Sequence, residues 1–444
     1  MNLLDPLRPL GRRLKAFRHR RSGGVVDPVR RIERVKLPKD RRVVAMTFDD
    51  GPCALPGRGG AEDPRPLTLR LLEILESFSA RGTFNIIGST QEGYPDRPGR
   101  PGTPLWNGIR YDHYPDFGED LQGGALHQLD LVRRMVAGGH ELSNHSFSHL
   151  LFGPKRLVYG SRRYQPSAAQ ALEDLRRLHR LVQEALGYTF RLARPPHYVD
   201  GTVDGFSAYD LYDLMDYLYL AASFDGGGWL PRPTYRESVE AMVRPLREAL
   251  ERDPQSLSGQ IIFQKDGYDM KGESPVLEGL YRQLELLTRH GYQVVTVGEL
   301  LRLSSFADVS PDDPAGEAGQ FLLSRGLAIA FRDNTLRPSQ PLTWHQLKIH
   351  LLPPDRRTRA KEIWWREGKE RRLDALSREG GGFLSSLGIE VPRDGGRAVR
   401  GPELKAVLEA WGPFFQGKGP RGLAFPDRPL TREEGLLAMA ACLR

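Results

Sequence analysis

The sequence predicts an α/β fold, in which a barrel-like domain with a parallel sheet is followed by a small, mostly α-helical module. Short apolar runs alternate with helical patterns over about 260 residues, which is typical of strands joined by crossover helices. After about residue 303 the composition changes and helix-start patterns recur. We therefore divide the 444 residues into a basic N-terminal arm at 1–39, an α/β domain at 40–302 and a helical module at 303–444.

Hydrophobic periodicity predicts the elements of the α/β domain. Short apolar runs indicate buried strands, whereas apolar residues spaced by three or four positions indicate helices. The expected strands are residues 43–48, 82–88, 218–224, 260–263 and 292–297. The expected helices are residues 67–79, 129–137, 169–186 and 277–289. In folds of this kind, the chemistry gathers at the carboxyl ends of the strands.

Residues 89–125 interrupt this alternation. The segment is rich in Gly, Pro and aromatic residues, and a loop of this length inside a domain is usually functional or disordered. We expect a packed inserted loop there. In the C-terminal module, PLTWHQL (341–347) and PLTREEGLL (429–437) each place a Thr three residues before a Gln or Glu, which predicts a capping box at a helix start. GPELKAVL (401–408) has a similar outline without the Thr, so we expect a helical repeat module.

Composition and charge exclude several classes of protein. A hydrophobic content of 39% is too high for a disordered chain, and no run approaches the roughly 18 apolar residues of a membrane-spanning helix. The net charge of +8 is concentrated in residues 1–42, which hold 14 Lys or Arg and four Asp or Glu, against 50 and 52 in the remainder. We favour a solvated basic arm. A basic segment lying on an anionic membrane surface is the alternative, and nucleic-acid binding is disfavoured.

TFDDGP (47–52) is the strongest chemical signal. Asp49 and Asp50 end an apolar strand, so that one carboxylate can ligate a metal while its neighbour meets the attacking water. Farther along, GHELSNHSFSH places His145 and His149 four residues apart, as on one side of a helical turn. Two imidazoles and one carboxylate make a metal site that leaves positions open for water and substrate.

With these motifs the sequence resembles the polysaccharide deacetylases, the NodB-homology domains of carbohydrate esterase family four. The resemblance covers about residues 40–302 and includes ARPPHY (193–198), GQIIFQKDGY (259–268) and the closing HGYQVVTVGELL (290–301). It implies a distorted (β/α) barrel. It also implies a metal-dependent hydrolase that removes acetyl groups from an N-acetylated, peptidoglycan- or chitin-like polysaccharide.

The resemblance assigns roles to individual residues. Asp49 matches the general base, which is oriented by Arg194, and the metal ligands match Asp50, His145 and His149. Zn²⁺ is the expected ion, with Co²⁺ or Ni²⁺ as alternatives, and it would lower the pKa of bound water to about 7. The backbone N–H of His197 is the expected oxyanion donor. The expected substrate-binding residues are Pro196, Tyr198 and Trp229.

Two positions depart from the family pattern. Lys265 stands where the family has the histidine that protonates the leaving amine, and Gly228 stands where it has the aspartate that orients this histidine. Three explanations remain open. Lys265 supplies the proton, His197 supplies it, or the protein is a slow esterase or a catalytically weak, polysaccharide-binding relative that retains the metal site.

The C-terminal module carries a second resemblance, to S-layer homology repeats. FADVSPDD (306–313), the segment 326–347 and AFPDRPLTREE (424–434) carry it, with Trp344 and His345 as departures from the usual motif. It implies binding of a cell-wall polymer and a location at the cell surface. Because no signal peptide is visible, the sequence otherwise predicts a cytoplasmic protein.

Overall fold

The computed structural model describes most of the chain, and it divides into two compact units. The described residues are 24–57, 63–89, 105–106, 109–110, 122–153, 155–157, 160–162, 166–230, 232–268, 274–368, 370–420 and 422–444. An α/β unit consists of Ile32–Arg34 and Lys39–Arg302, and a helical unit includes residues 24–31, Val35–Pro38 and Leu303–Arg444. Residues 24–38, which the sequence analysis assigns to the basic arm, are thus divided between the two units. Residues 1–23 lie outside the described part.

A single large sheet organises the α/β unit. Within the described residues it has nine strands. Six neighbouring strands of the sheet order given below, from β9 to β11, pair in parallel. In sheet order they are β1 (Arg31–Ile32), β10 (Leu218–Leu220), β9 (Leu192–Ala193), β6 (Glu141–Asn144), β3 (Thr83–Ile86), β2 (Val43–Asp49), β12 (Ile261–Lys265) and β11 (Phe224–Asp225), with β13 (Gln293–Val295) paired to β2.

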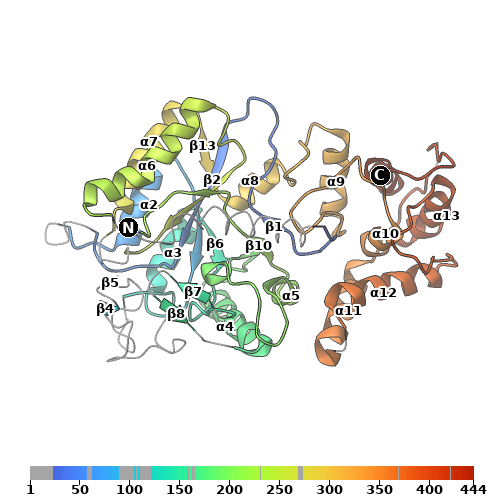
Figure 1. Ribbon diagram of the computed structural model, residues 1–444, viewed down its shortest axis with the longest axis horizontal. Helices are drawn as coiled ribbons and strands as arrows, with labels where there is room; N and C mark the ends of the chain where they lie inside the picture. The colour runs from blue at the N-terminus through green and yellow to red at the C-terminus, as the bar shows by residue number, and fades with distance from the viewer. Residues whose placement is uncertain are drawn as a thin grey trace. The chain divides into compact units, whose positions relative to one another are not determined.

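Helices surround this curled sheet. They are α2 (Leu67–Ser77), α3 (Leu129–Ala137), α4 (Ala168–Leu186), α5 (Ala208–Leu214), α6 (Tyr235–Arg252), α7 (Val276–Arg289) and α8 (Val297–Leu303). Figure 1 shows α6 and α7 side by side, whereas α3 and α4 pack near β6. The predicted distorted (β/α) barrel is therefore confirmed. No helix in the described part is long and apolar enough to cross a membrane.

The central strand β2 explains why the site forms where it does. All seven of its residues are buried, which accounts for the apolar run VVAMTF. Its last residue, Asp49, is in register with Asn85 of β3 and with Lys265 of β12. The pairing of parallel strands thus brings the ends of three segments that are distant in sequence to one edge of the sheet.

The inserted segment 89–125 falls mostly outside the described residues, which include only 89, 105–106, 109–110 and 122–125 of it. There β4 (Leu105–Trp106) pairs in an antiparallel manner with β5 (Ile109–Arg110). A second short antiparallel pair joins β7 (Lys155–Leu157) to β8 (Gly160–Arg162).

The helical unit is built from repeats. Its helices are α9 (Pro314–Ser324), α10 (Trp344–His350), α11 (Pro354–Glu367), α12 (Arg372–Ser386), α13 (Gly401–Trp411) and α14 (Arg432–Leu443), with the 3₁₀ turn η3 (Gly412–Phe415). Thr343 and Thr431 form the predicted capping boxes with Gln346 and Glu434.

A ring of backbone hydrogen bonds relates three of these helix starts. Leu342 N–H donates to the carbonyl of Leu430, Leu430 N–H to that of Val399, and Val399 N–H to that of Leu342. These residues precede α14, α13 and α10. The segment before α13 is therefore a third structural repeat, although it lacks the capping Thr.

Residues 24–31 complete the helical unit. The N–H of Asp27 donates to the carbonyl of Ala330, and the N–H of Arg332 donates to that of Val25. The Asp27 side chain is fully buried, with Oδ2 2.7 Å from Nη2 of both Arg332 and Arg372. This part of the predicted arm is a folded strand-like segment with a buried ion-pair network.

Candidate metal centre and active site

The two carboxylates of TFDDGP lie at the carboxyl end of β2. Asp49 is the last residue of the strand, and Asp50 follows it with a left-handed backbone φ of 80°. The next residue must be small, because a Cβ on Gly51 would lie 1.9 Å from Oδ2 of the buried Asp266. The turn thus places two adjacent carboxylates above the sheet edge.

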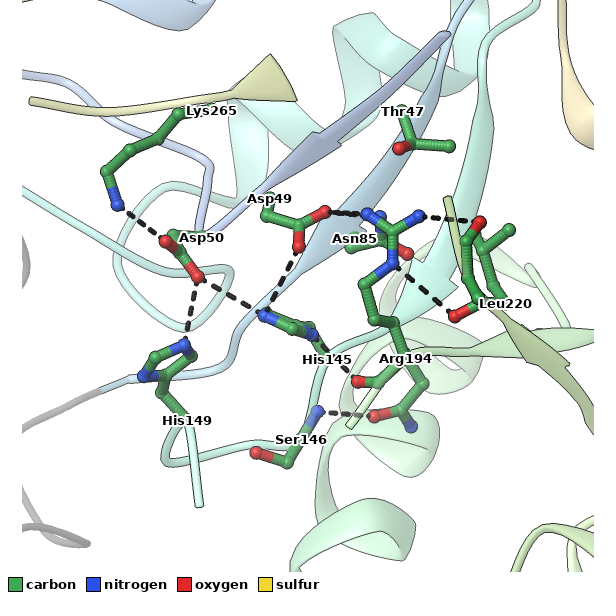
Figure 2. Close-up of polar contacts among 12 residues, drawn as sticks. Thr47, Asp49, Asp50, Asn85, His145, Ser146, His149, Arg194, Leu220 and Lys265 are labelled. Atoms are coloured by element: carbon green, nitrogen blue, oxygen red, sulfur yellow. Dashed lines mark hydrogen bonds and ion pairs between the residues drawn. The ribbon is translucent and has the colours of Figure 1, made fainter. Parts of the chain in front are cut away.

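Asp50, His145 and His149 converge on one point. Each offers one ligand atom, and the three atoms lie within 4.8 Å of one another. Nε2 of His145 and Nε2 of His149 are 3.2 and 2.9 Å from Oδ1 of Asp50 (Figure 2). Both histidines are almost fully buried, with 2% of each side chain exposed. The structure brings the three sequence-predicted metal ligands together.

The donor set fits a divalent cation. Nδ1 of His145 lies 2.7 Å from the carbonyl oxygen of Arg194, which can only accept a hydrogen bond. Nδ1 of His145 is therefore the donor of this hydrogen bond, and Nε2 is the ring nitrogen that lies on the side of Asp50. Metal-binding histidines are usually oriented in this way by a backbone carbonyl or carboxylate.

The segment that carries the two histidines is a loop, so the predicted helical turn is wrong. Ser146 and His149 both have left-handed backbone φ values, of 67° and 52°. The loop closes on itself because Ser146 N–H donates to Oδ1 of Asn144 and the Ser146 hydroxyl accepts from Leu150 N–H. These local side-chain bonds replace the bonds of a helix.

Asp49 is held through one oxygen. Its Oδ1 accepts from Arg194 Nη1 at 2.5 Å and from Asn85 Nδ2 at 2.6 Å, while its Oδ2 lies 3.8 Å from Nε2 of His145 (Figure 2). Burial by itself would lower the pKa of the Arg194 guanidinium. The negative charge of the neighbouring Asp49 outweighs this effect, so the pKa is raised. The arrangement turns the second oxygen of Asp49 toward the cluster of ligand atoms.

Asn85 is not among the site residues predicted from the sequence. A signal existed, because Asn85 lies in the strand next to β2, in register with Asp49. An amide at that register position, inside a fully buried strand (TFNI), is an expected partner for the carboxylate.

Lys265 lies beside the cluster. It is the last residue of β12, 7% of its side chain is exposed, and Nζ lies 2.5 Å from Oδ2 of Asp50. Asp50 therefore meets a lysine with one oxygen and two histidines with the other. Gly228 has a φ of 88°, and an added Cβ would lie 2.9 Å from Val276 Cγ2, so a side chain at this position would strain the backbone.

His197, Pro196 and Tyr198 form the short turn η2 (Pro196–Tyr198) that follows Arg194. The ring of His197 lies 5.2 Å from that of His149, so its side chain borders the predicted metal ligands. The Tyr198 ring centroid lies 5.7 Å from Cζ of Arg194, and Pro196 is buried.

Trp229 is half-buried and lies after β11. Its indole N–H is directed at the carboxylate of Asp225, at 3.4 Å. Trp229 thus follows a different strand from those that carry Asp49 and the histidines, and its contact is with an exposed carboxylate.

Comparisons with known proteins agree with this geometry. Residues 36–201 match the model of the polysaccharide deacetylase family. The chain is 24% identical over 269 residues to the peptidoglycan-N-acetylglucosamine deacetylase of Bacillus cereus. The aligned region covers 60% of this chain and 92% of that protein. It is 25% identical over 172 residues to the peptidoglycan-N-acetylmuramic acid deacetylase PdaC of Bacillus subtilis. This aligned region covers 37% of the chain and only 25% of that relative.

A solved structure is also similar. It is a CE4 family pseudoenzyme from Bacillus anthracis, with 16% identity, a TM-score of 0.37, and coverage of 61% of this chain and 68% of that chain. The family model and these two curated relatives thus show that the α/β unit is similar in sequence to polysaccharide deacetylases.

Proposed function

We propose that the protein is a metal-dependent deacetylase that hydrolyses acetamido groups of an N-acetylated polysaccharide, such as peptidoglycan or a chitin-like polymer. The observation that carries the proposal is the convergence of Asp50, His145 and His149 beside Asp49. Two of the curated relatives are peptidoglycan deacetylases, and they favour this substrate class.

Asp50, His145 and His149 would hold the ion, for which Zn²⁺ is our first choice. A divalent cation in such a site polarises a carbonyl oxygen and makes water nucleophilic near neutral pH. Asp49 has its Oδ2 directed toward the same point and accepts the proton of the attacking water. Arg194 and Asn85 fix the orientation of Asp49 by binding its other oxygen.

The oxyanion that develops on the acetyl carbonyl needs a hydrogen-bond donor in addition to the cation. We assign this role to the backbone N–H of His197, which follows the buried Pro196 and lies next to the histidine ligands. Pro196, Tyr198 and Trp229 are our proposed contacts to the sugar.

The leaving amine needs a proton, and Lys265 and His197 are the two candidates. Both border the metal ligands. General acid catalysis typically contributes about 10²–10⁴-fold, and it matters more for an amide than for an ester. Replacing the acid, as Lys265→Met or His197→Gln, should therefore reduce deacetylation of an acetamido sugar by that factor and spare an acetate ester. If a substitution lowers the rates on both substrates equally, or lowers neither rate, the replaced residue is not the general acid.

The direct test is acetate release from N-acetylglucosamine oligomers and from peptidoglycan, with Zn²⁺ or Co²⁺ added. The wild type should release acetate, a chelator should stop the reaction, and Asp49→Ala should reduce it to background. Glu173→Gln, at an exposed position of α4, is the matched control and should retain activity. Equal rates for the wild type and Asp49→Ala would end the enzyme proposal.

A second candidate is a catalytically weak, polysaccharide-binding relative that retains the metal site. It is favoured by one observation: the Oδ2 of Asp50 is engaged by Lys265, at the position where the resemblance places a histidine. Metal and oligosaccharide binding without acetate release would support this candidate.

For the helical unit, we propose binding to a cell-wall polymer. The cyclic arrangement of three related helix starts and the resemblance to S-layer homology repeats favour it. The full chain should then co-sediment with intact cell walls and remain in solution when the accessory polymers have been stripped from the wall. Equal sedimentation with both would contradict this role.

A further inference from the structure

The loop that carries His145 and His149 has an unusual backbone. Two of its five residues, Ser146 and His149, adopt the left-handed conformation although neither is glycine. L-residues seldom adopt this conformation unless the surroundings impose it. The position of both imidazoles therefore depends on whatever holds the loop.

Asp174, on the neighbouring helix α4, binds the middle of this loop. Its Oδ1 accepts from the backbone N–H of Phe147 at 2.7 Å and of Ser148 at 3.2 Å, and its Oδ2 accepts from the Ser148 hydroxyl at 2.6 Å. One carboxylate thus binds three donors from the two residues that lie midway between the histidines. Burial raises the pKa of Asp174, and these hydrogen bonds oppose that rise.

A second residue of α4 reinforces the contact. Arg177, one helical turn after Asp174, lies over the ring of Phe147, with its Cζ 3.8 Å from the ring centroid. The helix itself is well fixed, with a capping box at Ser167 and Gln170 and a left-handed Gly187 at its end. A rigid element therefore presents both side chains to the loop.

We propose that Asp174 is a positioning residue for the metal site, which sets the separation and direction of the two imidazoles by binding Phe147 and Ser148. The proposal rests on the proposed function, because it requires that His145 and His149 hold a cation. It extends that function to a residue of α4 that lies outside the motifs of the sequence analysis.

The test uses Co²⁺, whose visible absorption reports on its coordination. Asp174→Ala in the full chain should bind Co²⁺ at least about tenfold more weakly than the wild type and with an altered visible spectrum. Asp174→Asn keeps one acceptor oxygen and should recover part of both properties. Ser148→Ala removes a single hydrogen bond and should have a smaller effect.

The matched control is Glu173→Gln. Glu173 is adjacent to Asp174 on the same helix, but it is exposed and paired only on the surface with Arg180. It should bind Co²⁺ as the wild type does. Circular dichroism of each variant verifies that the helix content is retained, and Ser148→Ala keeps the test valid if Asp174→Ala does not fold.

The possible failures are distinguishable. If the wild type binds Co²⁺ and the folded Asp174 and Ser148 variants bind it with the same affinity and spectrum, the positioning role is wrong while the metal site stands. If the wild type binds no Co²⁺, both this inference and the proposed function are overturned.

Discussion

Asn85 illustrates how a single buried amide can orient a carboxylate, here that of Asp49, which we propose as the general base. It donates to the same oxygen of Asp49 that Arg194 binds, and its side chain is fully buried at the end of β3. With both donors on Oδ1, Asp49 cannot rotate without losing them, so Oδ2 stays directed at the metal ligands. In the proposed function, Asn85 therefore acts through Asp49 and does not contact the substrate.

We expect Asn85→Ala to lower kcat by about 10- to 100-fold, because a hydrogen bond to a charged group is worth about 1.5–3 kcal/mol. KM should change little, since Asn85 does not touch the sugar in this proposal. Steady-state kinetics on an N-acetylated oligosaccharide measure both constants. A loss confined to KM, or a parallel loss of metal binding, would contradict this role.

His140 provides a pH-dependent contribution to stability. It is buried, and its Nδ1 accepts a hydrogen bond from Gly82 N–H at 3.1 Å, which requires the neutral ring. Burial, and to a smaller extent the positive charge of Arg81, lowers its pKa from 6.5 to about 4. Because the folded state disfavours the proton, the stabilisation is complete above pH 6.5 and is lost as the pH falls toward 4.

The expected loss between pH 6.5 and pH 4 is on the order of 2–3 kcal/mol of unfolding free energy. Urea unfolding of the wild type and of His140→Gln at several pH values measures it. The glutamine variant retains an acceptor and does not titrate, so the difference between the two proteins should shrink at low pH. A difference that is independent of pH would contradict the assignment to His140.

At the scale of elements, the segment 24–31 is an integral part of the helical unit. Asp27 forms buried ion pairs with Arg332 and Arg372, and it also accepts from Val29 N–H. Arg372 has 1% of its side chain exposed. Removing the carboxylate would therefore take away a buried negative charge that two guanidinium groups bind, which is far more costly than losing a surface pair.

Asp27→Asn should reduce the stability of the helical unit by about 3–5 kcal/mol. Lys36→Met is the matched control from the same part of the chain: its partner Asp313 is half-exposed, and such pairs contribute about 0–1 kcal/mol. Thermal unfolding of the full chain followed by calorimetry compares the two variants. Equal effects of both substitutions would show that the buried network adds nothing.

The sequence predicted elements well where one hydrophobic pattern decides them. The helix expected at 129–137 is α3, and the strand expected at 43–48 is β2 with one further residue. It failed where side chains that are distant in sequence decide the backbone. The HxxxH spacing suits a helical turn, but Asp174 of α4 binds the middle of the segment and holds it as a loop.

The third repeat of the helical unit shows another limit. Arg400 stands where the other two repeats have a capping Thr, so the local pattern is incomplete. The structure compensates in part, since Glu403 still accepts from the N–H of Arg400 and the preceding Val399 joins the ring of backbone bonds. Such long-range pairing leaves no trace in local periodicity.

For the whole molecule, metal binding should be visible as thermal stability. A cation that binds only the folded α/β unit stabilises it by about 2.7 kcal/mol at a concentration one hundred times its Kd. Added Zn²⁺ should therefore raise the unfolding temperature of the wild type, and a chelator should reverse the shift. Asp50→Asn should lose this response; an undiminished shift would place the binding site elsewhere.

The path of the chain has a practical consequence. Ordered from the N-terminus, the polypeptide contributes to the helical unit, passes to the sheet at Ile32–Arg34, returns for Val35–Pro38 and leaves again at Lys39 before its final return at Leu303. The helical unit is thus formed by segments that are not contiguous in the amino-acid sequence. A graft of residues 303–444 onto another protein would lack Asp27, so recombination at that single junction would transfer an incomplete fold.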